Sequence, residues 1–373
     1  MTGARLAELR EIALPLVAPF QTSFGTQSSR RILLLRAEAE QDGTTFDGWG
    51  ECVAGDEPTY SAEYVDAAAL TITTQILPRL EQPVAASDVA GELAAIRGHP
   101  MAKAAVEMAV LDAELRAVGR SFAEFLGVTR SRVPSGVSVG IHGSIGELLD
   151  AVGGYLADGY VRIKLKIEPG WDLEPVAAVR RLVGPGVPLQ VDANAAYTRT
   201  DIDHLCRLDE FDLLLVEQPL AEDDLLGHAM LARAAATPVC LDESITSVTV
   251  AEDAIELGAC EVLNVKPGRV GGYLAARSIH DLCLARGVPV WCGGMLETGV
   301  GRAANAALAA LDGFTLTGDL SASRRFWAQD IVREPIDVVD GHVSVPDGPG
   351  FGFEIDGGFL DSVTTRVTDL SDD

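Results

Sequence analysis

Residues 160–170, YVRIKLKIEPG, alternate apolar and basic side chains as a β-strand does. Because successive side chains of a strand point to opposite faces, Lys164 and Lys166 share one face. Two ammonium groups held side by side repel each other, which favours loss of a proton from one of them. The pair therefore indicates a lysine prepared to act as a base.

The strand pattern recurs from about Val137 onward, and amphipathic helical stretches such as 172–183, 249–258 and 272–287 separate the strands. Strands that alternate with helices indicate right-handed crossovers and a parallel sheet. Eight strands within roughly 185 residues favour a closed barrel over an open sheet. The predicted strands are 137–141, 161–167, 188–194, 213–219, 238–244, 261–267, 289–295 and 314–320.

The two ends of the chain differ from this middle part. The first third mixes a strand at 31–40 with helices at 61–80 and 101–120. Segments 18–30 and 48–60 are polar or rich in glycine, and we expect loops there that close over a substrate. The tail returns to strand and turn character, so we expect it to rejoin the N-terminal part in a second domain.

Composition excludes several classes of function. The net charge of −26 argues against a nucleic-acid partner, because phosphate backbones are bound by basic surfaces. No apolar run approaches the ~20 residues of a membrane helix, and the first residues do not resemble a secretion signal. The six cysteines are widely spaced and form no CxxC pair, so we expect buried free thiols and a cytoplasmic enzyme.

Charged residues stand near the C-terminal ends of five successive predicted strands, and neighbours in this series are 24 to 26 residues apart. Such positions meet at the rim of a barrel where active sites lie. Three carboxylates brought together repel unless a cation joins them, and oxygen ligands favour Mg²⁺, with Mn²⁺ as the second choice. A lysine–carboxylate network without metal is the structural alternative. The five residues are Lys166, Asp192, Glu217, Asp242 and Lys266.

The second and sixth strands of an eight-stranded barrel lie opposite each other, so Lys166 and Lys266 are expected to face one another. A carboxylate substrate between them would present its α-carbon to a lysine on each side. Removing its weakly acidic α-proton requires stabilisation of an enolate, which a divalent cation supplies, and a base that titrates near neutrality. We expect Lys164, the cation and burial to lower the pKa of Lys166.

At these residues the sequence resembles the enolase superfamily in its muconate cycloisomerase branch. Segments 264–272 (NVKPGRVGG), 293–311 and 318–323 (GDLSAS) resemble the o-succinylbenzoate synthase and N-succinylamino acid racemase group. The likeness implies a modified (β/α)₇β barrel with an α+β capping domain. It implies an acid/base pair, Lys166 and Lys266, beside a Mg²⁺ site. The implied domains are 1–130 (cap), 131–325 (barrel) and 326–373 (returning segment).

The resemblance implies a Mg²⁺-dependent dehydration that makes o-succinylbenzoate, a step of menaquinone biosynthesis, with racemisation of N-succinylamino acids as a further activity. Racemisation as the main role and a muconate-type cycloisomerisation are the alternatives within the family. Two other interpretations come from the residues themselves. Lys266 could form an imine in a Schiff-base aldolase, and the barrel mouth could serve a carboxylate-binding protein without catalysis.

The implied substrate is a small carboxylate with a succinyl chain, and we expect a homo-oligomer with neither membrane nor nucleic acid as partner. Arg269, three residues after Lys266, is expected to tune the charge state of that lysine. Lys164 is expected to act at the reacting end of the substrate as well as to bind it. The remaining expected substrate contacts are Phe20, Ser135, Asn194, Gly293, Met295 and Leu296.

Overall fold

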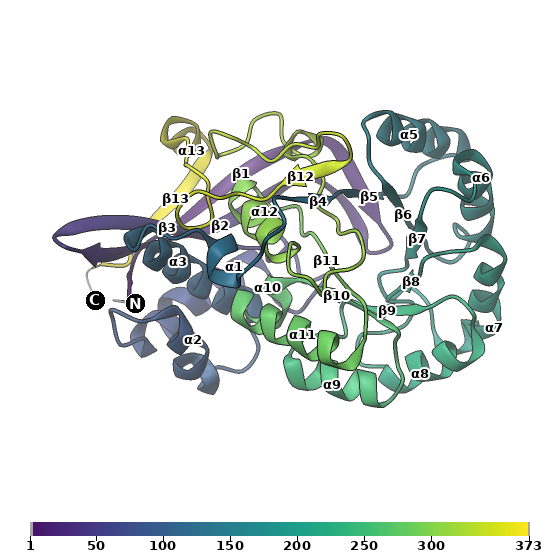
Figure 1. Cartoon of the computed structure of the whole chain (residues 1–373), viewed down its shortest axis with the longest axis horizontal. Coiled ribbons are helices and arrows are strands. Elements are labelled where there is room, and N and C mark those ends of the chain that lie inside the picture. The colour runs from purple at the N-terminus through teal and green to yellow at the C-terminus, as the bar shows by residue number, and fades with distance from the viewer. Residues whose placement is uncertain (1–2, 372–373) are drawn as a thin grey trace.

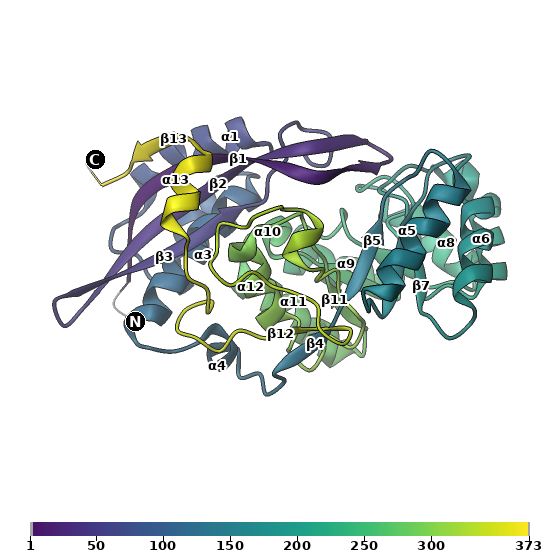
Figure 2. The ribbon, with the colours of Figure 1, turned by 90° about the horizontal axis from the view of Figure 1, so that it is seen from above.

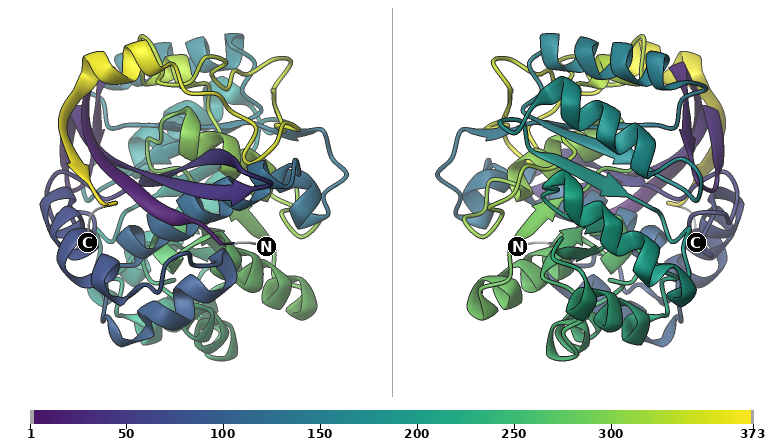
Figure 3. Two further views of the ribbon diagram at one scale, coloured as in Figure 1. Left: turned by 90° about the vertical axis from the view of Figure 1, so that its left-hand side faces the viewer. Right: turned by 90° about the vertical axis from the view of Figure 1, so that its right-hand side faces the viewer.

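The structure, a computed structural model, describes residues 3–371. A parallel sheet surrounded by helices lies beside a long antiparallel sheet (Figure 1). Viewed from above, the antiparallel sheet runs along one side of the molecule and its longest hairpin reaches over the parallel part (Figure 2). The end views show this antiparallel sheet on one side and the teal helices of the parallel part on the other (Figure 3).

The parallel sheet has seven strands, and its order follows the chain from β5 to β11. Each strand pairs in parallel with the next, and Lys166 pairs with Asp192, which in turn pairs with Glu217. The C-terminal strand ends therefore lie side by side, as the spacing of the charges predicts. The strands are β5 (Gly136–Val139), β6 (Arg162–Lys166), β7 (Leu189–Asp192), β8 (Val216–Glu217), β9 (Val239–Leu241), β10 (Val262–Val265) and β11 (Val290–Cys292).

The predicted eighth strand, 314–320, is not a continuous strand. It forms two isolated parallel bridges, one from Phe314 to Val290 and one from Gly318 to Ser135. The Gly136 amide donates to Gly318 O at 2.9 Å, and the Asp319 amide donates to Cys292 O at 3.0 Å. The segment thus bonds to both edges of the sheet and closes it, and the expected modified α/β barrel is confirmed with an irregular closing segment.

Helices cover the outside of the parallel sheet, and several begin at a side-chain cap of the kind that satisfies free N–H groups. Ser144, Ser247 and Thr298 each accept a backbone N–H at the start of a helix. The helices predicted at 172–183, 249–258 and 272–287 are present as α6, α9 and α11. The set is α5 (Ile145–Ala157), α6 (Leu173–Val183), α7 (Ile202–Leu205), α8 (Leu225–Ala234), α9 (Val248–Glu256), α10 (Pro267–Val270), α11 (Tyr273–Arg286) and α12 (Gly299–Leu308).

The antiparallel sheet has the order β13-β1-β2-β3, so the last strand of the chain pairs with the first. Helix α3 packs on β3 so closely that a side chain at Gly50 would lie 2.0 Å from Ala105 O, which requires glycine there. The C-terminal tail therefore rejoins the N-terminal part, while the exact domain limits stay a prediction. The elements are β1 (Arg5–Thr22), β2 (Gly25–Gln41), β3 (Thr44–Cys52), β13 (Thr364–Asp369), α2 (Ala86–Glu92), α3 (Pro100–Ala117), α4 (Phe122–Leu126) and α13 (Gly357–Val363).

Three expectations for the first third are wrong in detail. The predicted loop 18–30 is a hairpin in which β1 and β2 continue almost to the turn, and the predicted loop 48–60 begins inside β3. The helix predicted over 61–80 is α1 (Val65–Thr71), followed by a π-helix (Ile72–Ile76) and a 3₁₀ turn (Leu77–Arg79). A small sheet pairs β4 (Arg132–Pro134) with β12 (His342–Ser344), and 3₁₀ turns occupy Leu93–Ala95, Arg199–Asp201, Cys206–Phe211 and Ser323–Arg325.

All six cysteines are free thiols and only Cys206 is partly exposed, which confirms the expectation for the other five. No helix in residues 3–371 combines the length and the apolar character that a membrane crossing needs.

Candidate active site

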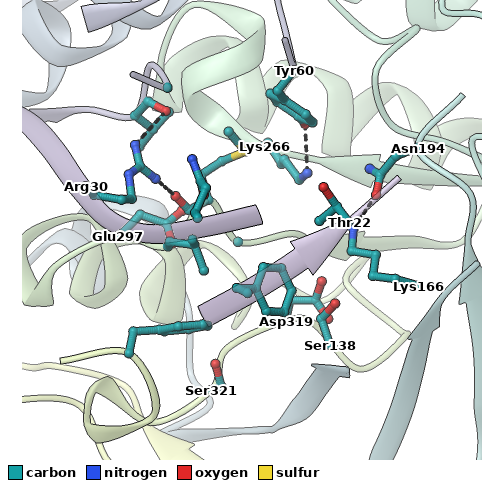
Figure 4. Close-up of a pocket in the computed structure, with 18 of the residues that line it drawn as sticks. Thr22, Arg30, Tyr60, Ser138, Lys166, Asn194, Lys266, Glu297, Asp319 and Ser321 are labelled. Atoms are coloured by element: carbon teal, nitrogen blue, oxygen red, sulfur yellow. Dashed lines mark hydrogen bonds between the residues drawn. The ribbon is translucent and has the colours of Figure 1, made fainter. Parts of the chain in front are cut away.

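A cavity of about 100 Å³, open at its mouth, lies at the C-terminal ends of the parallel strands (Figure 4). The β1–β2 hairpin covers it, since the Ile141 amide donates to Gln21 O at 3.0 Å and the Ser23 hydroxyl donates to Ala193 O at 3.2 Å. Its lining includes Phe20, Thr22, Phe24, Arg30, Tyr60, Ser138, Lys164, Lys166, Asn194, Lys266, Met295, Leu296, Glu297, Arg302, Asp319, Ser321, Arg325 and Phe326.

The two lysines predicted to face one another both line this cavity. Lys166, the last residue of β6, donates from Nζ to Asp192 Oδ2 and to Asn194 Oδ1, both at 2.6 Å. Lys266 follows β10 and donates to Asp242 Oδ2 at 2.7 Å and to the Tyr60 hydroxyl at 2.9 Å. Each lysine is thus tied to a carboxylate at the end of the neighbouring strand.

Lys164 lies deeper than Lys166, on the same side of the sheet, and both contact Asp192 Oδ2. Its Nζ is 2.5 Å from Asp319 Oδ2 and 2.9 Å from Glu217 Oε2. Burial opposes the charge of Lys164, but the carboxylates of Asp319, Glu217 and Asp192 outweigh it and raise its pKa above the usual range. Lys164 therefore stays an ammonium, and the expected effect of this charge on Lys166 remains a prediction.

The three acids predicted to hold a metal stand at or next to the ends of neighbouring strands, and their role as metal ligands remains a prediction. Across the described residues 3–371, no three His, Cys, Asp or Glu side chains gather closely enough to hold an ion. Each acid is bonded to a lysine instead, as in the lysine–carboxylate alternative. Burial and the charge of Asp192 raise the pKa of Glu217 well above its ordinary value, with Lys164 opposing them. Asp242 Oδ1 is buried without a hydrogen-bond partner.

Four of the expected substrate contacts, Phe20, Asn194, Met295 and Leu296, line the cavity. Ser135 and Gly293 are not among the lining residues, and their expected contact with substrate remains a prediction. Ser135 precedes β5 and its buried hydroxyl donates to Leu320 O at 2.8 Å. A side chain at Gly293 would lie 2.3 Å from Asn264 Oδ1 and 2.6 Å from Lys266 Cε.

Arg269 lies beside the partners of Lys266. Its guanidinium is 4.7 Å from the centre of the Tyr60 ring, its Nε is 3.7 Å from Asp242 Oδ1, and its Nη1 donates to Glu243 O at 2.7 Å. Burial opposes the charge of Arg269, but Tyr60 and Asp242 outweigh it and raise its pKa. The arginine thus reaches Lys266 through these two residues, and its expected tuning role remains a prediction.

Sequence reasoning missed several cavity residues, among them Asp319 and Tyr60, which contact the predicted lysines. Asp319 bridges Lys164 and Arg162, and Tyr60 bonds to Lys266. A signal for Asp319 existed, because it stands about two of the 24–26-residue units after Lys266. Tyr60 carried none, since it lies in a segment without periodicity.

Comparison with known proteins agrees with this geometry. Residues 7–127 match the family described as mandelate racemase / muconate lactonizing enzyme, N-terminal domain, and residues 147–358 match enolase C-terminal domain-like proteins. The chain belongs to this family of the enolase superfamily. The first match includes most of β1, all of β2 and β3, and α3, and the second includes β6 to β11 of the parallel sheet.

Individual members of the family are similar over nearly the whole chain. An N-succinylamino acid racemase of Amycolatopsis sp is 59% identical over 96% of each chain. An o-succinylbenzoate synthase of Geobacillus stearothermophilus is 46% identical over 93% of this chain and 92% of its own. The crystal structure of an enolase-superfamily member from Listeria innocua has a TM-score of 0.93 at 40% identity and covers 98% of both chains.

Proposed function

We propose that this enzyme removes the α-proton of carboxylates that carry a succinyl chain, dehydrating one such substrate to o-succinylbenzoate and racemising N-succinylamino acids. The observation that carries the proposal is the pair of lysines, Lys166 and Lys266, reaching one cavity from opposite parts of the sheet. The 46% identity to a synthase and the 59% identity to a racemase support both reactions. The synthase reaction would serve menaquinone biosynthesis, and the free thiols fit the cytoplasm.

The two reactions share their first step. Lys166, once neutral and released from Asp192, takes the α-proton, and the electron pair of the C–H bond moves into the substrate carboxylate. In racemisation Lys266 delivers a proton to the other face of the same carbon. In dehydration the β-hydroxyl leaves with the proton held by Lys166, and Lys266 stays charged. Lys164, which keeps its charge, lies where it can bind the substrate carboxylate.

The acids fit a divalent cation by their chemistry. Asp192, Glu217 and Asp242 offer only oxygen ligands, and Asp242 Oδ1 has no hydrogen-bond partner within the described chain. Burial and the charge of Asp192 raise the pKa of Glu217, and this direction is consistent with a cation that would offset the crowding of these acids. These three residues would hold Mg²⁺ or Mn²⁺, after Lys166 and Lys266 turn toward substrate. When bound, the cation supplies charge that stabilises the enolate.

Isotope exchange in D₂O tests the proposal. N-succinylphenylalanine of each hand is incubated with the wild type, and α-deuterium uptake is followed by NMR beside the dehydration assay. We expect Lys166→Ala and Lys266→Ala each to abolish racemisation and to exchange one enantiomer only, because one face loses its base. Lys103→Ala, on α3 outside the cavity, is the matched control. Racemisation that survives either cavity substitution contradicts the assignment.

Removal of divalent ions tests the cation. We expect EDTA to reduce α-proton exchange by at least ~10²-fold, and Mg²⁺ to restore it, because the enolate loses its counter-charge. Activity that resists the chelator, together with borohydride trapping of substrate on Lys266, would favour the Schiff-base aldolase instead. If the protein binds N-succinylphenylalanine but exchanges no α-proton, the result would favour a carboxylate-binding protein without catalysis. Lactone formation from a muconate would favour the cycloisomerase.

A further inference from the structure

Three arginines line the cavity without an acidic partner: Arg30, Arg302 and Arg325. Within residues 3–371, none of them lies within salt-bridge distance of an Asp or Glu, although the net charge of the chain is −26. Their hydrogen bonds go to backbone carbonyls instead. In a protein with so many carboxylates, a cavity arginine without an acidic partner keeps its positive charge available to a ligand.

Arg30 and Arg302 use their donors to hold the cavity wall together. Arg30 donates to Met295 O and to Ala54 O at 2.9 Å, which ties the end of β2 to the loop after β11. Arg302 donates to Glu297 O at 2.8 Å and to Ser321 O at 2.5 Å. Both side chains are almost fully buried, at 3% and 2% exposure. These two arginines therefore have a structural role in the cavity wall.

Arg325 differs from Arg30 and Arg302 in the number of hydrogen bonds that it makes. A guanidinium has five N–H donors, and the only hydrogen bond that Arg325 makes within residues 3–371 goes from Nη2 to Ser138 O. Its Nε is buried without a partner. Its Cζ lies over two aromatic rings, 4.6 Å from the centre of Phe326 and 5.5 Å from that of Phe20. The side chain is fixed in place while most of its donors remain free.

The position of Arg325 complements that of the lysines. In Figure 4, Lys266 and Tyr60 occupy one end of the cavity, and Ser138, whose backbone carbonyl accepts a hydrogen bond from Arg325, lies beside Asp319 toward the other end. The reacting α-carbon belongs near the lysines. Phe20 and Phe326 both line the cavity and pack edge to face, with ring centres 6.4 Å apart, so a chain that extends from it along this aromatic pair leads toward the guanidinium.

We propose that Arg325 binds the terminal carboxylate of the acyl chain and makes the enzyme selective for dicarboxylic acyl groups over neutral ones. This inference rests on the proposed function, which fixes the reacting end of the substrate. A planar guanidinium matches a carboxylate with two parallel hydrogen bonds. A neutral acyl group of the same length leaves the free N–H groups of Arg325 without an anion, and we expect it to bind more weakly for that reason.

The test compares two substrates that differ only at the chain end. N-succinylphenylalanine carries the terminal carboxylate, and N-succinamoylphenylalanine carries a neutral amide of the same shape. The kcat/KM for α-deuterium exchange is measured for both with the wild type, Arg325→Gln and Arg325→Lys. Arg324→Gln is the matched control, because Arg324 is 53% exposed, pairs with Asp337 and lies outside the cavity lining.

We expect the wild type to prefer the succinyl substrate by roughly 10- to 100-fold, the range of a charge-assisted hydrogen-bonded pair. Arg325→Gln should lose this preference through a fall in kcat/KM for the succinyl substrate alone, and Arg325→Lys should keep part of it. Arg324→Gln should behave as the wild type. An equal loss on both substrates in Arg325→Gln would show that the arginine only supports the aromatic wall, and an unchanged ratio would also overturn the proposal.

Calorimetric binding of N-succinylglycine separates this inference from the proposed function. In the first outcome, neither the wild type nor any variant exchanges the α-proton, but Arg325→Gln still loses affinity for N-succinylglycine and not for the matching N-succinamoyl compound. The proposed reaction is then wrong, and the carboxylate-binding site stands. If exchange proceeds while affinity and selectivity do not depend on Arg325, the reaction stands and the site is wrong.

Discussion

Asp319 holds two buried cations in place. Its Oδ1 is 2.7 Å from Arg162 Nη2 and its Oδ2 is 2.5 Å from Lys164 Nζ, and both cations are almost fully buried. Burial opposes the charge of Asp319, but Lys164 and Arg162 outweigh it and keep its pKa below the ordinary value. Because Asp319 is the only acid that contacts Arg162 in residues 3–371, its charge decides whether that arginine remains paired.

We expect Asp319→Asn to lower the free energy of unfolding by roughly 3–5 kcal/mol, since a buried cation left without its partner is strongly destabilising. Urea denaturation at pH 7 measures this change. Asp337→Asn is the matched control, because it breaks an exposed pair with Arg324 and should cost less than ~1 kcal/mol. Equal effects of the two substitutions would contradict the importance of the buried pairing.

At the scale of elements, acids of the antiparallel part bind the N-termini of barrel helices. Glu51, in β3, accepts the backbone N–H groups of Thr298 and Gly301 at the start of α12, both at 3.0 Å, and the Thr298 hydroxyl at 2.7 Å. Glu107, in α3, accepts the Leu274 N–H of α11 at 3.1 Å. These bonds satisfy helix N–H groups that have no partner within their own helix. They also fix the two parts of the molecule against each other beside the cavity.

Glu51→Leu should therefore destabilise the protein more than Glu51→Gln, by about 1–3 kcal/mol, because leucine leaves buried N–H groups unsatisfied while glutamine keeps an acceptor. Urea unfolding gives the free energies. Amide hydrogen exchange should show faster exchange at the first turn of α12 in the leucine variant only. Equal stability of the two variants would mean that the carboxylate does not cap the helix.

Some elements of the fold could be predicted from the sequence and others could not. The strands that end at or just before Lys166, Asp192, Glu217, Asp242 and Lys266 were predictable, because burial imposes an apolar pattern and the repeat imposes one spacing. The β1–β2 hairpin at 18–30 was not, since most of its side chains are exposed and leave no apolar face to detect. The pairing of Lys164 with Asp319 joins residues distant in sequence, so it depends on barrel closure.

At the scale of the whole molecule, burial of acids makes stability depend on pH. Burial raises the pKa of Glu51, Glu63 and Glu107 from 4.5 to about 7 each, and the charge of Glu297 adds to the effect at Glu51. In this pH range the folded protein binds more protons than the unfolded chain. The contribution of these three acids to the free energy of unfolding should therefore fall as pH rises from about 4.5 to about 7, where they lose their protons in the fold.

Glu107 offers the clearest measurement, because its environment contains backbone N–H groups and no charged partner within salt-bridge distance in residues 3–371. Unfolding by urea at pH 5, 6, 7 and 8 should show that the wild type loses more stability with rising pH than Glu107→Gln. A pKa shift of one unit corresponds to about 1.4 kcal/mol. The change in the free energy of unfolding between pH 5 and pH 8 should therefore differ by at least ~1 kcal/mol between the two proteins. The exposed Glu210→Gln controls for the loss of one negative charge and should keep the wild-type slope. Parallel curves for the wild type and Glu107→Gln would show that Glu107 is already ionised in the fold at pH 5, and that its bond to α11 outweighs the cost of burial.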